Sequence, residues 1–130
     1  ALALVGGDGS IHEAINGLLR RKDGKKIPIG LIPNGSGDDL CGAIGIKTGD
    51  SDKALEYITK GDLIKVDTYK IMIDHESEAQ IQETVNKNKS AKIEDYLRYE
   101  VINSGYGLIS NVSRNASPWK PLIGQVAYTI

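Results

Sequence analysis

The sequence has 130 residues, of which 40% are hydrophobic and 25% are charged, within the usual range for a globular domain with a buried core. Its net charge of -1 and pI near 6.1 provide no general attraction for nucleic acid or anionic lipid, so no nucleic-acid partner is expected and any membrane contact must be local. The single cysteine, Cys41, excludes an internal disulfide, and no apolar run approaches the roughly 20 residues of a membrane-spanning helix, which together favour a cytoplasmic protein.

The chain opens on a short apolar run over residues 2–5, which predicts a buried strand that ends at Gly6 and Gly7. Ser10 and Glu13 stand three residues apart, a spacing typical of a capping box at the start of a helix. The apolar positions that follow have a helical period: Ile11, Ala14, Ile15, Leu18 and Leu19. We expect this helix to pack on the sheet and to end at Gly24.

A second buried strand is predicted over residues 27–32, followed by a loop and a helix that begins at Asp38 or Asp39. The residues expected on the buried side of that helix are Leu40, Ala43 and Ile44. Ser51 is the expected N-cap of a further helix that ends at Gly61. The order strand, helix, strand, helix, helix predicts an α/β fold with a parallel sheet and ligand-binding loops at the carboxyl ends of its strands.

From Leu63 the apolar residues alternate, which indicates strands of a different sheet. The alternating positions are Ile64, Val66, Tyr69, Ile71 and Ile73. Residues 74–95 are polar and charged and predict a long, partly helical insertion. Beyond it, Tyr99, Val101 and Asn103 mark another strand.

This change of pattern predicts two parts: α/β structure over residues 1–62, and the start of a β-rich second domain over residues 63–130. The chain opens directly on a strand pattern, and residues 125–130 begin a helical pattern that finds no packing partner before the end. We therefore expect the fold to continue beyond both ends of this sequence.

The first glycine loop, GGDGS, joins the end of a strand to the N-terminus of a helix, where free N–H groups and the helix dipole favour an anion such as phosphate. The glycines that would let the backbone approach phosphates are Gly6, Gly7 and Gly9. Ser10 can donate its hydroxyl, whereas Asp8 beside a phosphate implies either a Mg²⁺ ion between them or an acceptor hydroxyl awaiting deprotonation. The structural alternative is a tight turn capped by an aspartate.

The second glycine loop, PNGSGDDL, follows the second predicted strand and also leads into a helix. Gly35 and Gly37 allow close approach of a ligand, Ser36 can donate to a phosphate, and Asp39 either caps its own helix or orients the first loop. A capped turn is again the alternative. Two such loops after adjacent parallel strands face one crevice, so their pairing favours a binding site.

The two loops resemble the diacylglycerol kinase catalytic family, which includes sphingosine kinases, ceramide kinases and bacterial lipid kinases. That family has GGDGT, then a Glu and an Asn-Gly pair, then a strand with a proline, then GTGND. The matching positions here are Gly7, Asp8, Gly9, Ser10, Glu13, Asn16, Gly17, Pro33, Gly35, Ser36, Gly37 and Asp39. Downstream, INSGYGLIS and LIGQVAY resemble the segment where these enzymes enter a second, β-rich domain.

The resemblance implies an incomplete nucleotide-binding domain that uses ATP with Mg²⁺ and transfers the γ-phosphoryl group to a lipid hydroxyl, on diacylglycerol or on a sphingoid or ceramide-like lipid. It makes Asp8 the essential carboxylate, acting either as base or as metal anchor through Mg-ATP. The residues expected to contact or shape the nucleotide site are Gly6, Gly7, Asp8, Gly9, Ser10, Glu13, Gly35, Ser36, Gly37 and Asp39. A lipid acceptor further implies transient contact of a cytoplasmic protein with a membrane surface.

Departures from the family pattern keep other readings open. Asp38 replaces the usual Asn, and its charge near the phosphates would either weaken ATP binding or recruit a cation. Ser113 stands near the place of an acidic residue in sphingosine kinases, which argues mildly against a sphingoid amine. NAD kinases and phosphofructokinases share the GGDG loop, although the second loop argues against them. Asp38 and the polar insertion also motivate a pseudokinase or regulatory domain.

Three further side chains are interpreted as structural. His12 and His75 lack the spacing of metal ligands, so a zinc site is not expected and surface positions suffice. Cys41 follows the second loop and is expected to be a small buried side chain rather than a nucleophile.

Overall fold

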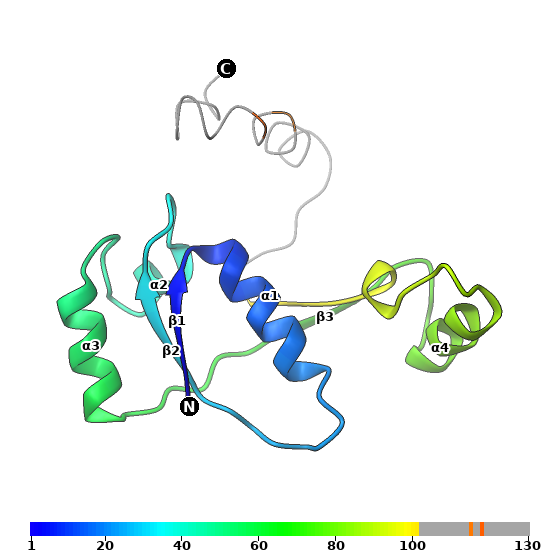
Figure 1. Cartoon of the computed structure of the whole chain (residues 1–130), viewed down its shortest axis with the longest axis horizontal. Helices are drawn as coiled ribbons and strands as arrows, with labels where there is room; N and C mark the ends of the chain where they lie inside the picture. The colour runs from blue at the N-terminus through cyan, green and yellow to red at the C-terminus, as the bar shows by residue number, and fades with distance from the viewer. Residues whose placement is uncertain (102–114, 116–117, 119–130) are drawn as a thin grey trace.

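The computed structural model describes residues 1–101 together with Asn115 and Pro118. This part of the chain has an α/β architecture, in which a parallel strand pair lies among helices and an antiparallel strand pair extends to one side (Figure 1). The predicted fold class is thereby confirmed. The expectations for Asn103, Ser113 and residues 125–130 lie outside the described residues.

The first half has the element order that the sequence predicts. Strands β1 (Leu2–Gly6) and β2 (Ile29–Pro33) pair in parallel, with Val5 opposite Ile32, and helix α1 (Asp8–Leu19) connects them. Helices α2 (Asp39–Ala43) and α3 (Ser51–Lys60) follow β2. Because parallel strands need a crossover connection, α1 is placed against the strand pair and its N-terminus lies at the carboxyl end of β1.

The strand pair is covered on two faces, but unevenly. On one face, Ile11 and Ile15 of α1 form a buried cluster with Leu40, and Leu4 of β1 packs against it. On the other face α3 lies over β2, where Gly30 makes room for Ile58, since a Cβ there would lie 2.7 Å from Ile58 Cγ1. The first strand was predicted to be buried, and this is wrong, because every residue of β1 is exposed or only half-buried.

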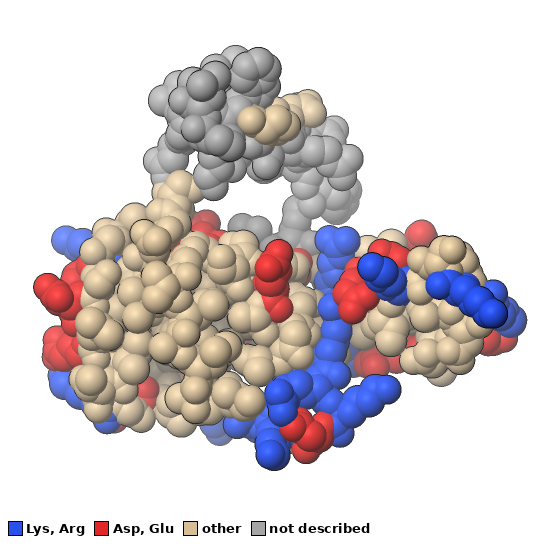
Figure 2. All heavy atoms as spheres, viewed as in Figure 1, with Lys and Arg blue, Asp and Glu red and all other residues tan. Residues whose placement is uncertain are grey.

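Two strand residues show this uneven cover: Val5 is 60% exposed and Leu2 is 38% exposed, because α3 covers β2 and leaves the neighbouring strand open. Figure 2 shows a largely uncharged surface on the side of the strand pair and α3, while lysines and arginines gather below the far end of α1. Among the described residues, no helix has both the length and the apolar character needed to cross a bilayer.

Several predicted helix boundaries are wrong. Helix α1 begins at Asp8 rather than Ser10, because Gly7 is the extended residue before the helix and its carbonyl accepts from Ile11 N at 3.2 Å. No side-chain cap forms there, so the expected capping box is absent, and α1 ends at Leu19, before Gly24. The helix α3 is capped by Asp50, which accepts from Lys53 N at 3.1 Å, and not by Ser51.

The other two expectations for this half have mixed outcomes. Gly61 ends α3 in the left-handed conformation, with φ of 72°, as predicted. Ala43, expected on the buried side of α2, is exposed, whereas Leu40 and Cys41 are buried as expected, and Cys41 packs with Ile46 and Ala54.

In the second half, β3 (Tyr69–Met72) pairs antiparallel with β4 (Leu97–Glu100). Between them lie α4 (Glu78–Lys87) and a short 3₁₀ turn, η1 (Ile93–Asp95), so the insertion is partly helical as predicted. The alternation at Ile64 and Val66 forms no strand, and these side chains are 65% and 46% exposed, which corrects the prediction that the sheet begins there. Alternation by itself supplies no partner strand.

Candidate functional site

The two glycine loops lie against each other at the carboxyl ends of β1 and β2. Asn34 N donates to Gly6 O at 3.2 Å, which extends the parallel pairing by one bond. A Cβ on Gly35 would lie 2.5 Å from Gly7 Cα, and one on Gly7 would lie 2.8 Å from Gly35 Cα. Glycine at both positions is therefore required for the approach of one loop to the other.

Asp8 joins the two loops through its side chain. Its Oδ2 accepts from Asp39 N at 3.1 Å and its Oδ1 accepts from Leu40 N at 3.2 Å. These are N–H groups at the start of α2 that have no partner within the helix, so the carboxylate caps α2 from a neighbouring loop. Asp39, which was expected to cap its own helix or orient the first loop, instead contributes its backbone N–H to Asp8, while its own side chain is exposed.

Asp38 holds the second loop in shape from inside the protein. Its backbone is left-handed, with φ of 54° and ψ of 41°, a conformation that Asn and Asp adopt more readily than other side chains. Its Oδ1 accepts from Gly35 N at 2.8 Å, and the residue is 1% exposed. Within residues 1–101, its Oδ2 is buried without a hydrogen-bond partner. The same backbone geometry and the same acceptor suit Asn, the usual family residue here.

A hollow of about 260 Å³ opens between the two loops. Its walls consist of Gly7, Asp8, Gly9, Ser10, Gly35, Ser36 and Gly37. The remaining predicted site residues do not line it: Gly6 ends β1, Glu13 is exposed on α1, and Asp39 donates its backbone N–H to Asp8. The two loops thus converge on one space, and its walls combine glycine backbone, hydroxyl groups and the N-terminus of a twelve-residue helix.

A larger depression, of about 760 Å³, lies over α4 and the turn before it. It is lined by Asp74, His75, Glu76, Gln80, Glu83, Thr84 and Lys87. This surface is wide, carries both signs of charge and has no glycine turn on which an anion could rest. The smaller hollow is therefore the candidate site, because its glycine backbone and hydroxyl groups suit a phosphate, whereas the larger depression is distinguished only by its size.

Two α1 residues make long-range contacts that the sequence did not predict. His12, expected at the surface, is half-buried and places Nδ1 3.0 Å from Glu100 Oε2. Asn16 is 5% exposed and binds the main chain of Tyr99. Their spacing of four residues predicts a shared helix face. The partner strand lies more than 80 residues further along the chain, so no local sequence pattern predicts which strand they contact.

Curated proteins with similar sequences are kinases by name. Sphingosine kinase 1 of Caenorhabditis elegans is 26% identical over 140 aligned positions, which cover 98% of this chain and 25% of that protein. Sphingoid long-chain bases kinase 1 of Arabidopsis thaliana is 31% identical over 130 positions, covering 97% of this chain and 14% of that protein. Diacylglycerol kinase of Staphylococcus carnosus is 37% identical over 70 positions, which cover 54% of this chain and 22% of that protein. The chain thus spans a quarter or less of the length of these relatives.

No solved structure gives a significant match to the chain. The family model of the diacylglycerol kinase catalytic domain matches residues 1–71, more than half of the 130 residues. The matched stretch contains both glycine loops, Asp8 and every residue that lines the hollow. The chain therefore belongs to the diacylglycerol kinase catalytic domain family, a family of lipid kinases.

Proposed function

We propose that this chain carries the phosphate-binding part of a lipid kinase that transfers the γ-phosphoryl group of ATP to a lipid hydroxyl. The observation that carries the proposal is the convergence of both glycine loops on one hollow at the N-terminus of α1. Free N–H groups and the helix dipole there favour phosphate, and Ser10 and Ser36 line the same space. With about 260 Å³, the hollow suits phosphate groups rather than a whole nucleotide, so the base would extend beyond it.

Asp8 is the carboxylate that this proposal places at the chemistry. Its two bonds to α2 use part of its capacity, since an ionised carboxylate has about four acceptor sites, and the others remain for Mg²⁺ or an acceptor hydroxyl. Within the described residues, no group of three Asp, Glu, His or Cys side chains is arranged to hold a metal ion. Asp8 would hold a Mg²⁺ ion that accompanies ATP, and the ion would supply positive charge that stabilises the phosphoryl group during transfer.

The acceptor is proposed to be a lipid, diacylglycerol or a sphingoid or ceramide-like molecule, because relatives named for both classes match the chain. Such an acceptor would bring a cytoplasmic protein into transient contact with a membrane surface. Relatives of this kind favour a lipid over the soluble acceptors of NAD kinases and phosphofructokinases. A pseudokinase remains a distinct outcome of the test described next.

The test is transfer from labelled ATP by the whole protein to diacylglycerol, sphingosine, ceramide and soluble alcohols, with Asp8→Asn and Asp52→Asn compared. Asp52 is an exposed acidic residue in the first turn of α3, so its variant should match the unchanged protein. Asp8→Asn should lower transfer at least about 10²-fold and keep nucleotide binding. It should also lower the free energy of unfolding by about 1 kcal/mol, because one acceptor for α2 is lost.

Three results would contradict the proposal or part of it. Full turnover by Asp8→Asn would remove that residue from the mechanism. Transfer only to soluble alcohols would replace the lipid acceptor. Nucleotide binding without transfer to any acceptor would identify a pseudokinase.

A further inference from the structure

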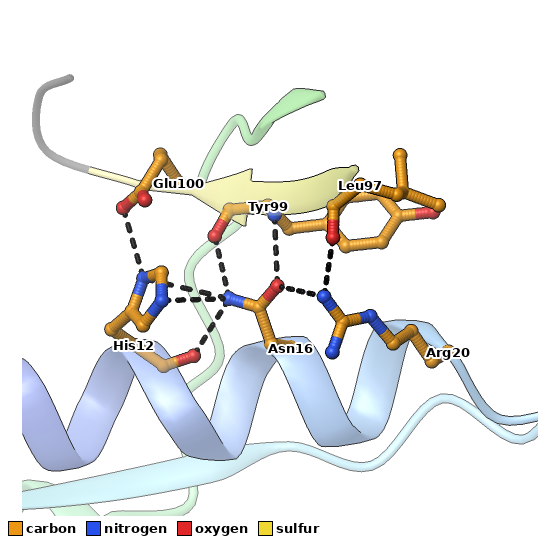
Figure 3. Close-up of polar contacts among 6 residues, drawn as sticks. All are labelled: His12, Asn16, Arg20, Leu97, Tyr99 and Glu100. Carbon is orange, nitrogen blue, oxygen red and sulfur yellow. Dashed lines mark hydrogen bonds and ion pairs between the residues drawn. The ribbon is translucent and has the colours of Figure 1, made fainter. Parts of the chain in front are cut away.

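A row of polar contacts ties α1 to β4 (Figure 3). Three side chains spaced four residues apart point toward the strand: His12 and Asn16 lie on one face of α1, and Arg20 follows at its C-cap. Arg20 donates to Leu97 O, and Asn16 binds the main chain of Tyr99. His12 pairs with Glu100. We call these contacts the α1–β4 seam.

Asn16 lies at the centre of the seam and takes the place of a partner strand. Its Nδ2 donates to Tyr99 O at 2.8 Å and its Oδ1 accepts from Tyr99 N at 2.9 Å. Nδ2 also donates to His12 O at 2.9 Å, and Oδ1 accepts from Arg20 at 3.2 Å. Because a side-chain amide carries both a donor and acceptor at these positions, a carboxylate or a hydroxyl of similar size cannot reproduce the set.

The seam also sets the direction in which the chain leaves β4. Leu97 lies beside Arg20 near the C-terminal end of α1, whereas Glu100 lies beside His12, one turn from Asp8. The strand therefore runs antiparallel to the helix, and the chain leaves β4 toward the end of α1 that carries Asp8.

Packing continues this connection into the candidate site. The side chain of Val101 packs against the cluster of Ile11, Ile15 and Leu40. The N–H of Leu40 in turn donates to Asp8. The exit of the chain from β4 and the candidate catalytic carboxylate are thus linked through one buried cluster.

We propose that Asn16 is a positioning residue: it fixes β4 on α1 and thereby holds Val101 in the buried cluster that contains Leu40, whose N–H donates to Asp8. The proposal rests on the proposed kinase function and adds a residue that does not touch the reacting atoms. Its physical basis is that a misplacement of about 1 Å between reactants lowers a rate by about 10²-fold. Loss of the seam should consequently affect the transfer step more than nucleotide binding.

The experiment compares Asn16→Asp with Asn86→Asp in the whole protein. Asn16→Asp keeps size and the acceptor for Tyr99 N, but it removes the donor and sets a carboxylate oxygen against two carbonyl oxygens. Asn86 is the matched control, since it is an exposed amide on α4 whose Oδ1 accepts from Gln82 at 3.0 Å. His12→Ala is a milder seam variant, in case the first does not fold.

Three quantities are measured: kcat for the lipid, the Kd of ATP, and amide hydrogen exchange over residues 97–100 and 2–6. We expect Asn16→Asp to lower kcat by about ten- to a hundredfold, to leave the Kd of ATP within about twofold, and to speed exchange only over residues 97–100. His12→Ala should change kcat in the same direction by about threefold or less. Asn86→Asp should leave all three unchanged.

Several outcomes overturn the positioning role. Faster exchange over residues 97–100 with normal kcat would make the seam purely structural, and an equal loss of ATP affinity and rate would mean that Asn16 acts through the phosphate loops. Unchanged exchange in Asn16→Asp would show that Asn16 does not fix β4 on α1, and it would leave the proposed kinase function unaffected. Absence of transfer by the unchanged protein would instead remove the kinase function, and the positioning role of Asn16 with it.

Discussion

The two halves of the described chain are held together in different ways. In the half formed by β1, α1, β2, α2 and α3, backbone lies directly on backbone at Gly7 and Gly35, and one carboxylate, Asp8, binds main-chain groups across the gap. In the half formed by β3, α4 and β4, ion pairs such as Lys70 with Glu78 lie at the exposed surface. The contact between the two loops is therefore intolerant of added atoms, whereas the second half should tolerate changes of surface charge.

Burial follows the same division. Ile11, Cys41 and Ala54 of the first half are at most 1% exposed and lie in two clusters with neighbouring apolar side chains. Among the described residues of the second half, the buried apolar side chains are Ile81 and Leu97, at 2% and 5% exposure. The candidate site lies between these closely packed loops, and rigid loops hold polar groups in place.

The largest expected effect comes from Gly35→Ala, which breaks the close approach of the loops. The added Cβ would lie 2.5 Å from Gly7 Cα and 2.6 Å from Asp38 Oδ1, so backbone must move. We expect the free energy of unfolding to fall by at least about 4 kcal/mol and nucleotide binding to be lost. Denaturant unfolding and equilibrium binding of ATP measure the two effects.

Gly17→Ala is the matched control for that change. Gly17 is exposed on α1, and a Cβ there meets nothing within 4 Å among the described residues. This variant should raise the free energy of unfolding by up to about 1 kcal/mol, since alanine favours helix. If Gly35→Ala were as stable as Gly17→Ala, the loops would not be packed as described.

An intermediate effect is expected from Ile81→Ala, which tests the buried core of the second half. Ile81 is the buried residue of α4, so its truncation should lower the free energy of unfolding by about 3 kcal/mol. Nucleotide affinity should be unchanged, because the hollow lies in the other half.

Lys70→Ala tests the surface of the same half. It removes the exposed ion pair with Glu78 and should leave the unfolding midpoint unchanged. Urea unfolding of Lys70→Ala and Ile81→Ala measures the two midpoints. A midpoint shift for Lys70→Ala equal to that for Ile81→Ala would show that surface pairs hold this half.

The smallest effect is expected at Cys41. Burial raises the pKa of its thiol, and the negative charges of Asp38 and Asp8 raise the pKa further. A raised pKa means less thiolate at any given pH, and the side chain is fully buried, so a thiol reagent at pH 8 should leave Cys41 unmodified in the native protein. Rapid labelling without denaturant would show that the first half opens, whereas labelling that follows unfolding supports a closed core.

Much of the first half could be predicted because its signals are local. The apolar run before Gly6, the helical period of Ile11 and Ile15, and the turn at Gly61 depend on residues within a few positions of one another. The boundary at Asp8 could not be predicted in the same way. It depends on Gly7 taking an extended backbone before the helix, in a loop that packs against the second loop.

The α/β order of elements and the meeting of the two loops could be predicted from the amino-acid pattern alone, because parallel strands bring their carboxyl ends to one edge. The contacts that fix the arrangement are visible only in the folded chain: Asp8 caps α2, Asp38 turns inward, and Asn16 binds a strand 83 positions away. Such contacts join groups remote in the chain, and hydrogen bonding between them depends on distance and direction in space rather than on any spacing that the sequence displays.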